Sequence, residues 1–245
     1  MHTEHPVGPG PTLTGVTSGA RDPELAPLAA FGPSTTHRIA EHVLREAWWT
    51  ACGAGDWAIA LRSPSGRLAA RISPFDPAMP YNAQLYRRAE RTGQVPRVQA
   101  EVTLHGGANL LILEFLQPVA PARATAFHRS IRARAPGVAE LAELVSVVHR
   151  QARAELPWCA AVIDANPTNV MARSTGELVL IDPFYADGPT LYGTLLTNAS
   201  RVARSIPRDD RAHMFELPLA STGRPDPATL QAMREALAAA DAAEV

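Results

Sequence analysis

The hydrophobic pattern of the chain changes near its middle, and this change limits the possible folds more than any other feature. Between residues 48 and 116, short apolar runs alternate with turn signals at 63–66 and 105–107, which is typical of an antiparallel meander. In the second half, the apolar residues of 138–156 recur at helical spacing. The sequence therefore predicts an α+β fold, with strands concentrated in its first half.

The first half is predicted to form five strands, with one helix inserted after the third. Pro80 suits the first position of that helix, which covers Tyr81 to Thr92 and ends at Gly93. The strands are expected at 48–52, 57–61, 67–72, 97–104 and 109–116.

The remaining elements are expected on both sides of this region. One helix is predicted over 36–47, and a hairpin is predicted from 170–173 and 178–181. Near the end of the chain, Asp226 is expected to cap a helix that begins at Pro227.

Three segments follow from this pattern. Residues 1–24 are rich in Gly, Pro and Thr without an apolar period, and we expect a flexible tail. Residues 25–117 are expected to form the sheet with its inserted helix. Residues 118–245 are expected to form a mainly helical part that carries the 170–181 hairpin.

Composition excludes several classes of protein. The 23 basic residues, all arginine, nearly balance 24 acidic ones, so no overall positive charge points to nucleic acid or to an anionic membrane. No apolar stretch approaches the ~20 residues of a membrane helix, and the first residues lack the features of a secretory signal. Two cysteines, Cys52 and Cys159, exclude a disulfide framework and fit a cytoplasmic location.

Three polar residues around the 170–181 hairpin are candidates for chemistry. Asp164 follows an apolar run, Asn169 comes five residues later, and Asp182 follows the second strand. Because a hairpin brings its outer ends together, we expect Asn169 and Asp182 to lie side by side. Their oxygen atoms suit a hard cation such as Mg²⁺, and Asp164 could accept a proton from a hydroxyl group. The alternative interpretation is a pair of ordinary aspartate turns flanking a surface hairpin.

The segment VIDANPTNVMARSTGELVLIDPF, residues 162–184, resembles the catalytic and metal-binding core of the protein-kinase-like superfamily. The resemblance implies a bilobal fold with a small antiparallel sheet lobe, a mainly helical lobe, and ATP between them. It also implies that Asp164 is the catalytic base and that Asn169 and Asp182 bind Mg²⁺. Pro167 and the Asp182-Pro183 pair resemble the aminoglycoside and choline phosphotransferases and the small phage and bacterial kinase-like proteins more than eukaryotic kinases.

The same resemblance suggests where the phosphates of ATP would bind. Gly53 and Gly55 lie where the family has its phosphate-covering loop, although a tight hairpin turn explains them equally well. Arg71 occupies the place of the family's lysine, a residue absent from this chain. Its expected ion-pair partner is Glu90 on the inserted helix, with Gln84 as the competing candidate. Solvated charges at Arg71 and Glu90 are the alternative.

The run 111–119 resembles the hinge that holds adenine, with Glu114 and Phe115 as the hinge positions; an edge strand ending at Pro118 is the alternative. The family's His-Arg before the catalytic aspartate is replaced by Val162-Ile163, and no Ala-Pro-Glu follows Asp182. These departures argue against a eukaryotic-type protein kinase.

The resemblance implies an ATP- and Mg²⁺-dependent phosphotransferase that phosphorylates a hydroxyl group, first of all Ser or Thr on a protein. A small-molecule kinase of the aminoglycoside or choline type is one alternative, and a pseudokinase that binds nucleotide or a partner without turnover is another. The location implied is the cytoplasm of a bacterium, or of its host if the chain is encoded by a phage. Residues 191–245 remain without an assigned role.

Overall fold

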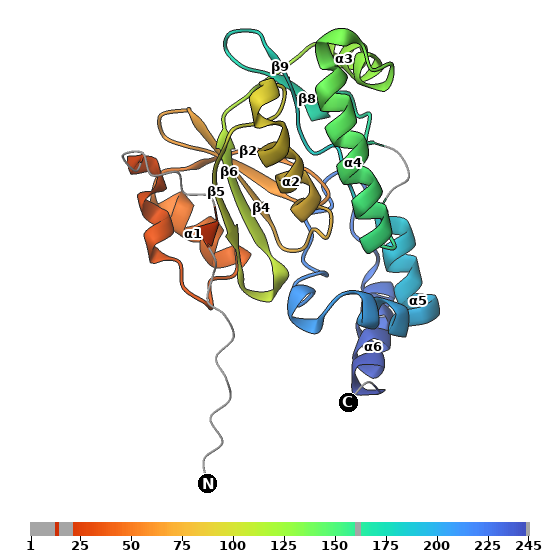
Figure 1. Cartoon of the computed structure of the whole chain (residues 1–245). Helices are drawn as coiled ribbons and strands as arrows, with labels where there is room; N and C mark the ends of the chain where they lie inside the picture. Colours follow the sequence, from red (N-terminus) through yellow and green to blue (C-terminus); the bar gives the residue numbers. More distant parts are fainter. Residues whose placement is uncertain (1–12, 15–21, 160–162, 244–245) are drawn as a thin grey trace.

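The structure is a computed structural model that describes residues 13–14, 22–159 and 163–243 of the chain. Two antiparallel sheets and several helices form an α+β fold, as the sequence predicts (Figure 1). The α-helices are α1 (His37–Glu46), α2 (Met79–Ala89), α3 (Pro121–Arg132), α4 (Ala139–Glu155), α5 (Gly188–Ser205) and α6 (Pro227–Ala243). Short 3-10 helices are η1 (Pro23–Ala30), η2 (Glu90–Thr92), η3 (His105–Gly107), η4 (Pro136–Val138), η5 (Pro167–Asn169) and η6 (Arg208–Asp210).

The larger sheet has six strands in the order β1-β5-β6-β4-β3-β2. The five strands predicted in the first half are confirmed to within two residues at each end, and β1, from the segment expected to be a tail, adds the sixth. Its strands are β1 (Leu13–Thr14), β2 (Thr50–Ala54), β3 (Ile59–Arg62), β4 (Leu68–Ser73), β5 (Val98–Thr103) and β6 (Asn109–Glu114).

Alternation along β6 decides which helix covers each face of this sheet. Leu110 and Ile112 pack with the buried residues of α1, whereas Leu111 and Leu113 pack with those of α2. The two helices therefore lie on opposite faces of the sheet, as Figure 1 shows. The side chain of Thr36 caps α1 by accepting a hydrogen bond from the Ile39 amide.

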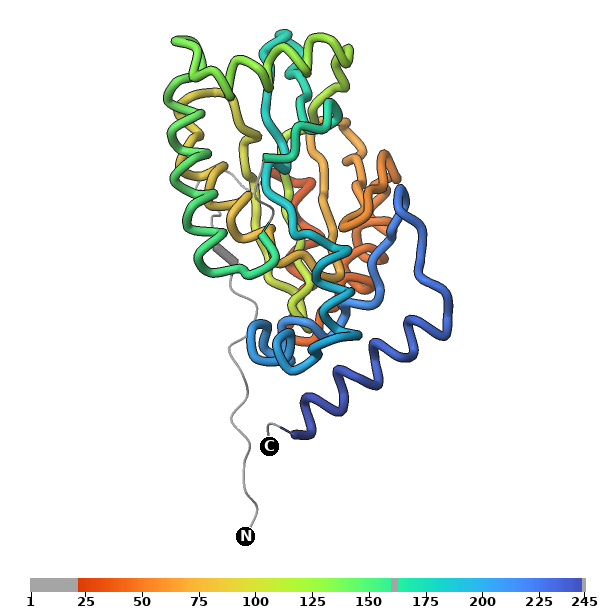
Figure 2. Tube along the Cα trace, turned by 90° about the vertical axis from the view of Figure 1, so that its right-hand side faces the viewer, coloured from red at the N-terminus to blue at the C-terminus, as the bar shows by residue number. Residues whose placement is uncertain are grey.

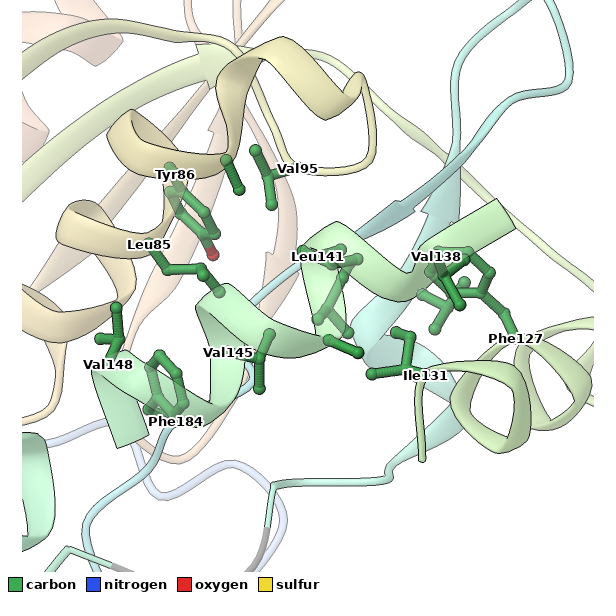
Figure 3. Packing of buried hydrophobic residues seen from close by; sticks show 14 of the residues in the cluster. Leu85, Tyr86, Val95, Phe127, Ile131, Val138, Leu141, Val145, Val148 and Phe184 are labelled. Carbon is green, nitrogen blue, oxygen red and sulfur yellow. The ribbon is translucent and has the colours of Figure 1, made fainter. Parts of the chain in front are cut away.

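The face that carries α2 continues into the helical part of the molecule. Leu85 and Tyr86 of α2 meet Leu141 and Val145 of α4 in one apolar cluster (Figure 3). The cluster also includes Phe184, which follows the 170–181 hairpin. Helix α2 therefore joins the large sheet to the elements that carry the candidate site.

The predicted hairpin forms the smaller sheet, in the order β7-β8-β9. Its strands are β7 (Gln117–Pro118), β8 (Val170–Ala172) and β9 (Leu178–Leu180). Val170 pairs with Leu180, so the residue before β8 and the residues after β9 lie at the same end of the hairpin.

Helices α5 and α6 pack against each other in the C-terminal part, and the sequence pattern had predicted only α6. Asp226 accepts a hydrogen bond from the Thr229 amide at 3.0 Å, as expected for the cap of α6. Figure 2 shows the segment before α6 running up beside the β2–β3 region. Within the described parts of the chain, no helix combines the length and the apolar character needed to cross a membrane.

Candidate functional site

The three polar residues selected around the hairpin meet at its open end. Asn169 Nδ2 donates hydrogen bonds to Asp164 Oδ2 at 2.8 Å and to the Asp182 carbonyl oxygen at 3.2 Å. The amide of Ile181 donates to the Asn169 carbonyl at 2.8 Å, and the amide of Asp164 donates to the Pro183 carbonyl at 3.0 Å. The predicted proximity of Asn169 and Asp182 is therefore confirmed, with Asp164 beside them.

Asp182 has an unusual backbone conformation, with a φ angle of 41°. Few residues other than glycine adopt this left-handed region, and a following proline disfavours helical conformations, so strain is concentrated at Asp182-Pro183. The Tyr86 hydroxyl holds the segment by accepting a hydrogen bond from the Asp182 amide at 2.7 Å. Buried Asn82 exchanges two hydrogen bonds with the backbone of Phe184, at 2.9 and 3.1 Å. Helix α2 thus fixes the strained segment.

Arg71 of β4 reaches the same aspartate from the large sheet. Its Nε lies 3.0 Å from Asp182 Oδ2, and its Nη2 lies 2.6 Å from Asp76 Oδ2. Its third nitrogen, Nη1, is buried and meets no hydrogen-bond partner among the described residues. A buried donor without a partner is costly, and it gives the site a cationic NH₂ group that no described residue uses.

The charges around Arg71 shift the pKa values of its neighbours. Burial opposes charge on Arg71, but the carboxylates of Asp182 and Asp76 outweigh it and raise the arginine pKa, so the guanidinium stays charged. Burial also raises the pKa of Asp76, and Arg71 offsets only part of this effect. Tyr86 stays protonated because burial and the Asp182 carboxylate raise its pKa well above the ordinary value.

The expected pairing of Arg71 with Glu90 is not what the structure has. Glu90 begins η2 and is exposed, whereas Arg71 pairs with Asp76 in the turn between β4 and α2. The start and the end of the eleven-residue α2 are roughly 16 Å apart, so Glu90 lies too far along the helix. Gln84, the competing candidate, donates instead to Gln151 of α4 at 2.9 Å.

The two glycines predicted to approach phosphate lie at the end of β2. Neither has a positive φ angle, and a Cβ atom added at Gly53 or Gly55 would meet no atom closer than 3.8 Å. The β2–β3 turn itself therefore does not require glycine at either position. A ligand that approaches the backbone closely at this turn would need such open space.

The turn after Gly55 is fastened by the segment that precedes α6. The Asp56 carboxylate accepts hydrogen bonds from the amides of Ser221, at 2.6 Å, and Thr222, at 3.1 Å. The amide of Leu219 donates to the Asp56 carbonyl at 3.1 Å. No motif in the sequence marks this segment, although it holds the loop proposed to cover phosphates.

The predicted hinge residues lie at the end of β6, with Glu114 as its last residue and Phe115 directly after it, and their backbone donors are already used. The Glu114 amide donates to the Arg97 carbonyl at 3.1 Å, and the Phe115 amide donates to the Arg67 carbonyl at 2.7 Å. The Glu114 carboxylate also binds Arg173, at 2.7 Å. Contacts of these two residues with a purine base would therefore have to use their carbonyl oxygens.

Sequence reasoning missed several residues that position the site, namely Asp76, Asn82, Tyr86 and His128. His128 of α3 lies 3.1 Å from the Asn166 carbonyl and so supports the loop between Asp164 and Asn169. Their spacing carries no motif; the one usable signal was Asp76, an acidic residue in the apolar stretch after β4.

A cavity of about 350 Å³ lies between the start of α2, the β5–β6 turn and the end of α5. Asp76 lines it, but Asp164, Asn169 and Asp182 do not. The cavity is therefore separate from the three residues at the end of the hairpin.

The fold and the site together define an α+β protein in which a largely enclosed arginine and an asparagine are arranged around three aspartates. Three carboxylates against one guanidinium leave an excess of negative charge, which favours a bound cation. With Asn169 Nδ2 engaged, its Oδ1 and the Asp182 carboxylate can supply hard oxygen ligands. Comparison of the sequence with protein-family models and with curated proteins finds no match.

Proposed function

We propose that the chain is an ATP- and Mg²⁺-dependent phosphotransferase of the protein-kinase-like type, acting on a hydroxyl group. One observation carries the proposal: Asn169 links Asp164 to Asp182 while Arg71 reaches Asp182 from the large sheet. A base, two cation ligands and a cation that can bind phosphate are the parts that phosphoryl transfer requires.

Each residue has a definite role in this proposal. Asp182 and Asn169 hold Mg²⁺, which neutralises charge on the phosphates of ATP. Asp164 accepts the proton of the attacking hydroxyl as the phosphorus–oxygen bond forms. Arg71 uses its spare Nη1 to bind a phosphate oxygen. Positioning and charge neutralisation supply most of the catalysis.

The proposal also gives roles to the two parts of the molecule. The large sheet with α2 forms one lobe, the helical part forms the other, and the nucleotide lies between them with its phosphates under the Gly53–Gly55 turn. The acceptor we favour is Ser or Thr on a protein, and a small hydroxyl compound is the alternative.

The experiment combines ligand-induced thermal shift with transfer of labelled γ-phosphate, for wild type, Asp182→Asn and Asp164→Asn. At 100 times the dissociation constant, Mg·ATP should stabilise the wild type by about 2.7 kcal/mol, or roughly 5–10 °C for a chain of this size. We expect Asp182→Asn to lose both the shift and transfer, and Asp164→Asn to lose transfer by at least about 100-fold while keeping the shift.

Asp209→Asn is the matched control, because Asp209 is an exposed aspartate of η6. Its shift and transfer rate should equal those of the wild type. An Mg·ATP shift that survives Asp182→Asn, or no shift in the wild type, would contradict the proposed nucleotide site.

A pseudokinase is the second candidate, and the state of Asp182 favours it. Arg71 Nε binds one carboxylate oxygen, and the Tyr86 hydroxyl binds the other at 3.2 Å. Mg²⁺ must displace at least one of these partners before it can bind. A nucleotide-induced shift that does not depend on Mg²⁺, without measurable transfer to protein or small acceptors, would favour this candidate.

A further inference from the structure

A second polar cluster lies away from the candidate site, where α1 meets the segment after η6. Glu216 Oε2 lies 3.2 Å from His37 Nε2, and Glu216 Oε1 lies 3.1 Å from His213 Nδ1. The two imidazole rings are 4.8 Å apart, in an edge-to-face arrangement. One potential ligand atom from each of the three residues falls within 4.8 Å of the other two.

Glu216 contacts one nitrogen of each ring and leaves the other nitrogen of each ring unused by it. His37 Nδ1 and His213 Nε2 are buried and have no hydrogen-bond partner among the described residues. The side chain of His37 is only 9% exposed, so water has little access to it. The nitrogens that face Glu216, His37 Nε2 and His213 Nδ1, are therefore the ones in position to share a ligand with its carboxylate.

The neighbouring turn is shaped to receive His213. A Cβ atom at Gly106 would lie 2.5 Å from His213 Cδ2, so a glycine at this position makes room for the ring. The ring of His105, in the same turn, is centred 6.2 Å from that of His213. Three parts of the chain, α1, η3 and the segment 213–216, therefore converge on the cluster.

We propose that His37, His213 and Glu216 form a binding site for a borderline divalent cation, of which Zn²⁺ is the best fit. Two imidazoles and one carboxylate form a ligand set that Zn²⁺ uses, with a fourth position left for water. Tetrahedral ligands at bond lengths of about 2.0 Å are roughly 3.3 Å from one another. The His–Glu distances of 3.1 and 3.2 Å are close to this spacing.

Bound metal would fasten the C-terminal segment to α1. A few residues after Glu216, the same segment donates its amides to Asp56 in the β2–β3 turn. A cation at the cluster would thus anchor both ends of residues 213–222 on the first half of the chain. This inference does not depend on nucleotide binding.

Arg38 is the group that competes with a cation for Glu216. Its Nη2 lies 2.8 Å from Glu216 Oε2, but its side chain is 76% exposed and can turn into solvent. Replacing Arg38 with alanine should therefore strengthen metal binding, because it removes a positive charge from beside the carboxylate.

The test is calorimetric titration with Zn²⁺ of tag-free full-length protein, after removal of metal with a chelator. We expect one site per chain in the wild type, at least tenfold weaker binding in His213→Ala and Glu216→Gln, and tighter binding in Arg38→Ala. Co²⁺ should give a visible absorption spectrum of a four-coordinate site in the wild type and lose it in His213→Ala.

His42→Ala is the matched control, because His42 is an exposed histidine on the same helix. Melting curves recorded with chelator present show whether each variant is folded, and Glu216→Gln preserves the size of the side chain. Unchanged Zn²⁺ affinity in folded Glu216→Gln or His213→Ala would overturn the proposal, as would no binding by the wild type. Loss of binding only when His2 and His5 are replaced would overturn it too.

Discussion

Two arginines with little exposure hold together different regions of the molecule, and their hydrogen bonds differ: the side chain of Arg71 is 13% exposed and that of Arg211 is 5% exposed. Arg71, in the candidate site, donates Nε and Nη2 to two aspartates, and its buried Nη1 has no partner in the part of the chain that the structure describes. Arg211, between α5 and α6, donates Nε to the Ile206 carbonyl at 2.7 Å and both terminal nitrogens to Asp241, at 3.1 and 2.5 Å. The first guanidinium is incompletely bonded, and the second is bonded at all three nitrogens.

The aspartates that bind these two arginines, Asp76 and Asp241, also differ, because their pKa values are shifted in opposite directions. Burial raises the pKa of Asp76, and its bond to Arg71 does not fully compensate. Hydrogen bonds from Arg211 lower the pKa of Asp241, which lies closer to solvent. Arg211 is thus arranged for stability, whereas Arg71 keeps a donor that no described residue uses and an aspartate neighbour that is costly to ionise. Such an arrangement is typical of sites that bind a charged ligand.

The largest expected effect is that of removing Arg71. Arg71→Met leaves the Asp76 carboxylate buried without a cation, and breaking such a pair costs about 3–5 kcal/mol of unfolding free energy. Arg211→Met should cost less, about 1.5–3 kcal/mol, because Asp241 can be solvated. Urea denaturation at pH 7 measures both values.

Arg87→Ala provides the reference for that experiment. Arg87 pairs with Glu101 near the surface, where its side chain is 51% exposed, and such pairs contribute less than about 1 kcal/mol. If Arg71→Met costs no more than Arg87→Ala, the contrast between a tightly coupled site and an ordinary surface pair is wrong.

The next largest effect concerns how the unfolding free energy depends on pH. Asp76 and Asp241 should contribute to this dependence with opposite signs. The folded chain binds a proton at Asp76 more tightly than the unfolded chain, so this residue lowers stability as the pH rises from 3.8 through its raised pKa. Asp241 contributes stability above pH 3.8, and this contribution is lost as the pH falls through its lowered pKa. Each unit of pKa difference corresponds to about 1.4 kcal/mol.

Unfolding free energies measured from pH 3 to pH 7 test these signs. Relative to the wild type, the Asp76→Asn variant should become more stable as the pH rises. The Asp241→Asn variant should lose most stability relative to the wild type at neutral pH. In acid its stability should approach that of the wild type. Slopes of the same sign in the two variants would contradict the comparison.

The smallest expected effect concerns the contact between the C-terminal segment and the β2–β3 turn. Asp56→Ala removes the acceptor for the Ser221 and Thr222 amides, which are exposed and can bind water instead. We expect a loss of about 0.5–1.5 kcal/mol. Hydrogen exchange at Ser221 and Thr222 should become faster, while the amide of Leu191 within α5 should be unaffected.

Local pattern was enough to predict five of the six strands of the large sheet, β2 to β6, together with α1, α2, α4, α6 and the hairpin. The apolar run of β6, the Thr36 cap and the glycine after η2 each act within a few residues, so they are readable without the fold. Helix α5 was missed because Gly188, Pro189 and Gly193 weaken its local signal.

The proximity of Asn169 to Asp182 was predictable for the same reason, because a hairpin places its outer ends together whatever surrounds it. The partner of Arg71 was not predictable in this way. Arg71 pairs with Asp76 and not with Glu90 because of the direction in which α2 runs relative to β4. That direction is set by the packing of α2, which the sequence pattern does not show.

The sequence by itself thus determined most of the strands and helices and the meeting of Asp164, Asn169 and Asp182, since these depend on interactions between residues close in the chain. Only the tertiary structure decided that Asp76 and Tyr86 complete the site, that residues 219–222 hold the β2–β3 turn, and that His37 meets His213 and Glu216. These contacts join residues far apart in sequence. They form where apolar packing brings the elements together, and no local pattern encodes that arrangement.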